Sequence, residues 1–226
     1  MRAASLLLMI TSLLFSDYAC SQNVQKPVQK DWTRVYVKDV GHFDIPPTME
    51  IQKGLFKKFV ENYREVNGYD TLQLTVQQRG VNDFTKESQE TFARIDFETA
   101  IDAEGDNPSS NFDMFSLGQD ILTDMGTQID ELYKDAIKNS PEYKKIGMKL
   151  IEWYPMKFET INGMLCYHMS WKRQFSNNPY VMVNMYIFPN NDREHTITMS
   201  YRIEDAEIWK ADFEKVLDSF RITNLK

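Results

Sequence analysis

Hydrophobic and polar side chains alternate with a period of two between residues 149 and 202, which is the pattern of β-strands. The dipeptide Asn162-Gly163 interrupts this alternation and favours a tight two-residue hairpin turn. Further turn signals lie at residues 176–179 and 189–192. The segment therefore predicts a four-stranded antiparallel meander.

The hairpin turn also predicts a register for the first two strands of the meander. The expected pairs are Ile161 with Met164, Phe158 with Tyr167, and Met156 with Met169. Alternation then predicts one apolar face that packs in the core: Tyr154, Met156, Phe158, Leu165, Tyr167, Met169, Trp171, Val181, Val183, Met185, Ile187, Ile197, Met199 and Tyr201. The opposite, polar face is expected to carry Lys157, Glu159, His168, Ser170, Asn184, Thr196, Thr198 and Arg202.

Shorter patterns precede the meander. Residues 34–52 are expected to form two extended pieces around Gly41 and Pro46-Pro47, because proline excludes helix there. The periodicities that follow predict a helical face at residues 55–63 and strands at residues 72–76 and 93–101.

Two longer amphipathic helices complete the expected fold. Apolar residues recur at steps of three and four over residues 117–137, where Ser116 and Gln119 suit a capping box. The stripe of the second helix consists of Trp209, Phe213, Val216, Leu217 and Phe220. The sequence thus predicts one α+β domain over residues 34–226, an antiparallel sheet packed by a long central helix and a C-terminal helix. A polar tether, residues 22–33, precedes this domain.

The first 21 residues have the pattern of an export signal. Arg2 precedes a short apolar run, residues 6–15, and Ala19 and Ser21 form a small-x-small cleavage site. The run is too short to cross a bilayer, which takes about 20 apolar residues. We therefore expect an exported protein that is periplasmic or secreted, with residues 1–21 removed.

Cys20 leaves a second interpretation of the same segment open. A lipidated Cys20 would anchor the protein to a membrane, but charged Asp17 stands where that processing prefers an apolar residue. A membrane association is expected only in that case. Once Cys20 is removed or acylated, Cys166 has no internal cysteine partner, so the domain is expected to hold no disulfide.

The net charge of −7 bears on the class of partner. An acidic chain repels phosphate backbones, and the Lys53, Lys57 and Lys58 cluster is too short for a basic stripe, so no nucleic-acid partner is expected. The sequence contains no Gly-x-Ser-x-Gly, His-Glu-x-x-His, Cys-x-x-Cys or glycine-rich phosphate loop. We accordingly expect no cofactor.

An acidic segment carries the sharpest candidate for a metal site. Asp102, Glu104, Asp106 and Asp113 stand at positions 1, 3, 5 and 12 of a calcium loop. Position 6, where glycine is needed, holds Asn107. The alternative is a solvated acidic turn whose side chains bond their own backbone, and the sequence favours that alternative.

Met164, Cys166 and His168 share one side of a predicted strand and resemble soft metal ligands. The hairpin register places the cation of Lys157 opposite His168, which disfavours binding of a second cation. A nucleophilic pair of Cys166 and His168 lacks an identifiable third residue that would orient it. Core packing by the methionines and a bonded surface histidine explain the three residues more simply.

The sequence also resembles a known fold family. The opening at residues 43–47, the meander, and the ending with Trp209, Phe213 and residues 217–221 are together similar to the PsbP-like fold. That resemblance implies small exported or organelle-lumen domains, mostly non-catalytic, which bind proteins or assist assembly. It transfers no catalytic residue.

The leading functional hypothesis is an exported non-catalytic domain that binds a protein or a small ligand in the bacterial envelope. Its contact surface is expected to include Asn184, Tyr186 and Arg202 on the polar sheet face, or the long acidic helix. The alternatives are an exported hydrolase with a dispersed active site and a calcium-stabilised structural domain.

Overall fold

The computed structural model describes residues 30–54, 57–58, 72–101, 119–190 and 193–224. The expected signal peptide with Ala19, Cys20 and Ser21 lies outside the described residues. The same holds for most of the tether, for most of the helical face at residues 55–63, and for the calcium candidates Asp102, Glu104, Asp106 and Asp113.

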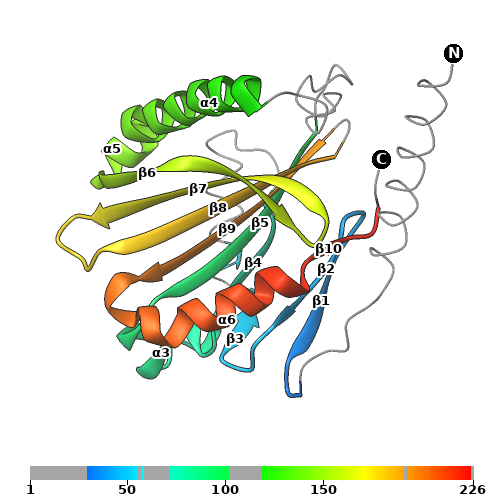
Figure 1. Ribbon diagram of the computed structural model, residues 1–226. Coiled ribbons are helices and arrows are strands. Elements are labelled where there is room, and N and C mark those ends of the chain that lie inside the picture. The colour runs from blue at the N-terminus through cyan, green and yellow to red at the C-terminus, as the bar shows by residue number, and fades with distance from the viewer. Residues whose placement is uncertain (1–29, 55–56, 59–71, 102–118, 191–192, 225–226) are drawn as a thin grey trace, which may run out of the picture.

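Two antiparallel sheets make up the strand part of the fold (Figure 1). The large sheet has the order β3 (Met49–Ile51), β4 (Leu72–Gln78), β5 (Ala93–Ile101), β9 (Arg193–Arg202), β8 (Val181–Asn190), β7 (Met164–Phe175) and β6 (Met148–Ile161). The small sheet has the order β1 (Thr33–Val37), β2 (Gly41–Ile45) and β10 (Arg221–Ile222). The α-helices bounded within the described residues are α3 (Glu87–Glu90), α4 (Gln119–Asn139), α5 (Pro141–Lys145) and α6 (Ala206–Ser219). The fold is therefore α+β, and the predicted meander is β6 to β9.

The hairpin between β6 and β7 has the predicted turn. Asn162 and Gly163 both adopt positive φ angles, 53° and 82°, as a two-residue turn of this kind requires. The pairs Ile161 with Met164 and Phe158 with Tyr167 are confirmed. The pair Met156 with Met169 is wrong, because the register shifts between Tyr154 and Lys157.

A carboxylate from α4 occupies this irregularity in β6. Oδ1 of Asp130 accepts a hydrogen bond from the backbone N–H of Met156 at 2.7 Å and another from Nε1 of Trp153 at 2.8 Å. The irregular register of β6 also changes which side chain faces Trp171. Trp153, and not Tyr154, pairs with Trp171 and stacks on it at 5.7 Å between ring centroids.

The large sheet is covered on both sides, α4 lying on one face and α6 on the other (Figure 1). We call these the α4 face and the α6 face. The α6 face carries Ile95, Phe97, Ile197, Met199, Tyr201, Asn184, Tyr186, His168, Glu159 and Lys157. The α4 face carries Arg94, Asp96, Thr196, Thr198, Val183, Met185, Ile187, Tyr167, Met169, Trp171 and Phe158.

The expected division into one apolar and one polar face is therefore wrong. The register between β8 and β9 pairs Tyr186 with Ile197 and Met185 with Thr198. Directly paired residues point to the same side of a sheet, so the apolar side chains of β9 lie opposite those of β8. The apolar area changes face across the width of the sheet.

Each face consequently has its own hydrophobic core. On the α6 face, Trp209, Phe213 and Val216 of α6 join a cluster that includes the inner side chains of β5 and β9 and those of the small sheet. On the α4 face, Tyr167, Met169 and Ile187 are buried against Tyr133 of α4 and half-buried neighbours. Trp209, Phe213 and Val216 of the predicted C-terminal stripe thus pack on one face, and Tyr133 of the predicted central stripe packs on the other. Leu132, which the helical pattern also placed on the apolar stripe, is 69% exposed, so that part of the prediction is wrong.

The small sheet joins the two ends of the described chain. A Cβ atom at Gly41 would lie 1.8 Å from the carbonyl oxygen of Arg221, so only glycine lets β10 pass at this distance. The buried carboxylate of Asp44 accepts two hydrogen bonds from Arg34, at 2.8 and 3.0 Å, and this bonding raises the pKa of Arg34. The backbone N–H of Asp44 donates to Ser219 Oγ at 2.8 Å.

Candidate functional site

A cavity of about 590 Å³ lies on the α4 face at the end of the sheet nearest α5. We call it the arginine cavity, because guanidinium groups from three different strands line it. Its described lining consists of Phe92, Arg94, Asp96, Tyr143, Met148, Arg173, Phe175, Asn178, Pro179, Val181 and Arg202.

Strand register brings the three arginines together. Val181 of β8 pairs with Arg173 on one side and with Arg202 on the other, so these two side chains flank it on one face. Strands lie about 4.8 Å apart, which places the Cα atoms of Arg173 and Arg202 about 10 Å from each other. Arg94 follows one step along the sheet, opposite Ser200.

The charge of the cavity is predominantly positive. Asp96 is the one acidic residue among its described lining residues, and it forms an ion pair with Arg94, whose Nε lies 2.7 Å from Oδ2. Nη1 of Arg202 donates to the backbone carbonyl of Glu90 at 2.8 Å, a neutral acceptor that leaves its charge uncompensated. In a chain of net charge −7, this cavity is a local concentration of positive charge.

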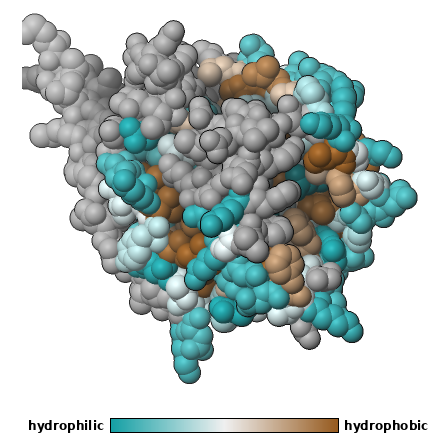
Figure 2. All heavy atoms as spheres, turned by 180° about the vertical axis from the view of Figure 1, so that it is seen from behind, coloured by the Kyte–Doolittle hydropathy of each residue, from teal (hydrophilic) through white to brown (hydrophobic). Residues whose placement is uncertain are grey.

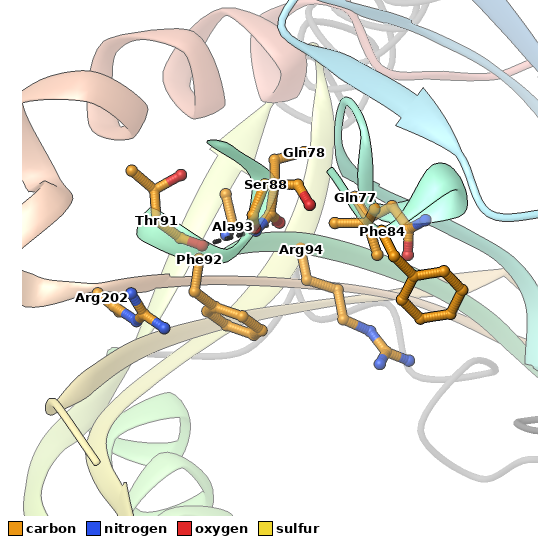
Figure 3. A pocket seen from close by; sticks show the side chains of 10 residues that line it. Gln77, Gln78, Phe84, Ser88, Thr91, Phe92, Ala93, Arg94 and Arg202 are labelled. Carbon is orange, nitrogen blue, oxygen red and sulfur yellow. Dashed lines mark hydrogen bonds between the residues drawn. The ribbon is translucent and has the colours of Figure 1, made fainter. Parts of the chain in front are cut away.

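A second cavity of about 360 Å³ adjoins the first and shares Phe92, Arg94 and Arg202 with it. Figure 3 shows Phe92 between the two arginines, with all three side chains directed to the same side. The remaining lining residues are Gln77, Gln78, Val81, Phe84, Ser88, Thr91 and Ala93. The two cavities are therefore neighbours at the end of the sheet.

Exposed apolar side chains are scattered over the described surface, and two of them lie at these cavities. Phe84, 62% exposed, lines the second cavity, and Phe175, 43% exposed, lines the arginine cavity. Figure 2 shows the back of the molecule, where apolar residues lie in separate patches among hydrophilic ones. Within the described residues, no helix is both long and apolar enough to span a bilayer.

The structure does not bring the expected binding residues together. Asn184 and Tyr186 lie on the α6 face, whereas Arg202 lies on the α4 face, so the predicted shared surface is wrong. Of these three residues, only Arg202 lines the two cavities. Arg94 and Arg173 were not among the predicted binding residues; only the pairing of their strands with the neighbouring strands places them beside Arg202.

Asn184 and Tyr186 belong to a separate polar cluster on the α6 face. Nδ1 of His168 lies 3.1 Å from Oε1 of Glu159, and Nε2 lies 3.4 Å from Oδ1 of Asn184. The His168 ring stacks on Tyr186 with 4.2 Å between ring centroids. Lys157 pairs with His168, as the hairpin register predicts.

This cluster has the geometry of an acid–base pair but lacks an activated nucleophile. Cys166 is fully buried, and burial, with a smaller contribution from Glu159, raises the pKa of its thiol to about 12. The thiol is therefore protonated and unreactive at neutral pH. Glu159, His168 and Asn184 satisfy one another, which is the arrangement of a structural polar network.

Among the residues that the structure describes, no group of three or more His, Cys, Asp or Glu side chains converges as a metal site. His195, fully buried, is bonded through its ring nitrogens to Thr99 Oγ1 at 2.9 Å and to Asn190 Nδ2 at 3.1 Å. This histidine supports the core.

Comparison with known proteins assigns no family. No protein-family profile matches the chain, and no curated protein is significantly similar to it in sequence. Among solved structures it is similar to cyanobacterial PsbP (CyanoP) from Synechocystis sp. PCC 6803, at 13% identity and a TM-score of 0.49, over 85% of this chain and 92% of that one.

A second structural neighbour is PA94 from Pseudomonas aeruginosa, a protein of unknown function. It has 11% identity and a TM-score of 0.36, over 84% of this chain and 95% of its own. The PsbP-like resemblance of the sequence thus has a PsbP neighbour among solved structures, while membership of that family stays a prediction.

Proposed function

We propose that this protein is an exported, non-catalytic module that binds a small anionic ligand in the arginine cavity. The observation that carries the proposal is the convergence of Arg94, Arg173 and Arg202 on a cavity with one acidic lining residue among those described. Export rests on the pattern of residues 1–21 and implies a periplasmic or secreted protein, or a lipid-anchored one if Cys20 is acylated.

An anion suits this cavity for physical reasons. A guanidinium group is always charged and donates in a fork that matches carboxylate or phosphate oxygens. Arg94 already shares its charge with Asp96, so Arg173 and Arg202 supply the uncompensated part. The volume of about 590 Å³ falls within the range of roughly 300–1,000 Å³ that is typical of small-molecule sites.

Isothermal titration calorimetry with succinate, citrate and inorganic phosphate tests the proposal. We expect at least one of these anions to bind, and the substitution Arg173→Gln to weaken its binding about tenfold, because one charge-assisted contact is lost. The matched control is Lys157→Gln, which removes an exposed cation from the opposite face of the sheet. Equal affinities in the two variants, or no binding of any anion, would contradict the proposal.

The intact mass of the protein purified from its own cells tests export separately. Loss of residues 1–21 without any added mass is the expected result. A diacyl mass on Cys20 would replace soluble export by lipid anchoring. A full-length mass would contradict both forms of processing.

A further inference from the structure

We infer that the arginine cavity and the second cavity together take one elongated ligand, a long-chain carboxylate whose head lies at the arginines and whose hydrocarbon chain extends to Phe84. The inference rests on the proposed function and specifies its ligand class. It depends on three features: the junction of the two cavities, the apolar character of the second one, and the way in which Phe84 is held.

The junction gives the combined site its elongated form. Phe92, Arg94 and Arg202 line both cavities, so these three residues form the boundary that the two cavities share. Arg173 lines only the first cavity and Phe84 only the second, so the two side chains belong to different cavities. Figure 3 shows Arg202, Phe92, Arg94 and Phe84 following one another along this region.

The second cavity offers apolar surface although several polar residues line it. Nε2 of Gln78 donates to the carbonyl oxygens of Ser88 and Thr91, at 2.9 and 2.7 Å, and its Oε1 accepts from the N–H of Ala93 at 3.1 Å. The amide of Gln77 is bonded on both sides to other side-chain amides. Since these groups are satisfied within the protein, a ligand here meets mainly hydrocarbon.

Phe84 is held at the edge of the second cavity by a rigid loop. Its backbone is left-handed, with φ 53° and ψ 40°, which an aromatic residue adopts only where its surroundings impose it. Its N–H donates to the carbonyl of Val81 at 3.2 Å, and Oε1 of Glu50 accepts from the N–H groups of Gly80 and Asn82. The backbone that carries the exposed ring is thus held in place before a ligand arrives.

Charge and shape together favour a carboxylate with a linear chain over a compact polyanion. A compact anion would use Arg173 and Arg202 and leave the apolar surface around Phe84 and Val81 wet. A hydrocarbon chain removes that surface from water, and each buried methylene adds to the affinity. An uncharged chain of the same length would leave the arginines without an anionic partner.

The test is calorimetric titration of the full mature chain with decanoate, acetate and decanol. We expect decanoate to bind at least about tenfold more tightly than acetate, because of its buried methylenes, and more tightly than decanol, because of its charge. Arg173→Gln and Phe84→Ala should each weaken decanoate binding about fivefold or more. Phe84→Ala should leave the affinity for succinate within twofold.

Two further variants keep the test decisive. Tyr36→Ala removes an aromatic side chain that is 73% exposed on β1 and lines neither cavity, so it should change nothing. Phe84→Gly relieves the left-handed strain, so it should fold and lose decanoate affinity like Phe84→Ala.

The possible failures are distinguishable. If Phe84→Ala changes the affinity for decanoate no more than Tyr36→Ala does, or if acetate and decanoate bind with equal affinity, the inference of an elongated ligand is overturned. The proposed function still stands in that case if Arg173→Gln weakens the binding of succinate. If decanoate affinity survives Arg173→Gln combined with Arg202→Gln, the anion site itself is overturned.

Discussion

The two faces of the large sheet are built from the same strands but differ in how completely they are closed. The α6 face has an extensive buried cluster to which β5, β9, α6 and the small sheet all contribute. The buried cluster of the α4 face is smaller: Tyr167, Met169 and Ile187 lie among half-buried neighbours, and Trp171 and Val183 are buried on the same face. A sheet that buries opposite faces at its two sides leaves one polar area on each face, and these areas are where function can reside.

The two polar areas also differ. On the α6 face, Glu159, His168 and Asn184 satisfy one another. On the α4 face, Arg173 and Arg202 line a cavity whose one described acidic residue is already paired with Arg94. A cluster that satisfies itself serves stability, whereas guanidinium groups without an ionic partner among the described residues are available to the anionic ligand that we propose.

The comparison is tested most strongly by removing the same side chain from each core. Met199 on the α6 face and Met169 on the α4 face are both buried, with exposures of 2% and 0%. Replacement by alanine should cost about 2–5 kcal/mol, with Met199→Ala near the upper end and Met169→Ala near the lower. Half-buried Met156 and Met185 can move into the space left by Met169, whereas Ile95, which pairs with Met199, is itself buried in the larger cluster.

Urea unfolding of both variants and the wild type measures this difference in free energy. A larger loss for Met169→Ala would show that the α4 face is the more rigid one. That result would reverse the comparison.

The attachment of α4 to the sheet is the next feature to break. Asp130→Ala removes a carboxylate that accepts hydrogen bonds from Trp153 and Met156, and it should destabilise the protein by about 1.5–3 kcal/mol. Hydrogen exchange should accelerate in α4 while protection in β5 and β9 is retained. Asp124→Ala, at an exposed position of the same helix, is the control. Uniform acceleration in both cores would mean that they do not open independently.

Alkaline pH provides the smallest and most local test. Cys166 and Tyr167 point to opposite faces, and burial raises the pKa of each to about 12. The unfolded chain loses these protons nearer pH 9 and pH 10. The contribution of each group to the free energy of unfolding is therefore fully present below those values and is lost as the pH rises towards the folded-state pKa. The Cys166 contribution should fall by about 1 kcal/mol between pH 9 and 10.

Urea unfolding at pH 8, 9, 10 and 11 checks this dependence. Cys166→Ala should remove the loss that begins near pH 9, and Tyr167→Phe the loss that begins near pH 10. Curves that are unchanged by both substitutions would show that neither core excludes water as the structure implies.

Local signals made much of the fold predictable from the sequence. Asn162-Gly163 specifies a turn through its own backbone preferences, and the stripe of Trp209, Phe213 and Val216 specifies a buried helix face. The assignment of faces depended on distant information. The shift in β6 is stabilised by Asp130 of α4, and the pairing of β8 with β9 determines which of their side chains share a face.

The site was less predictable for the same reason. Arg94, Arg173 and Arg202 stand far apart in the chain, and each alone resembles a solvated strand residue. Only the combined register of β5, β9, β8 and β7 brings them to one cavity. Asn184 and Tyr186 were equally plausible binding residues from the sequence, because alternation within one strand does not determine which side chains of the neighbouring strand share its face.

The closure of the small sheet has a consequence for folding kinetics. β2 cannot gain its third strand until β10 has formed its pairs with Gly41 and His42, and Asp44 contacts Ser219 from 175 residues away along the chain. Contacts of such long sequence separation form slowly, because loop-closure entropy is lost before the contact stabilises anything. The meander can therefore assemble early from local hairpins, and the docking of β10 beside Gly41 becomes the late step that completes the native state.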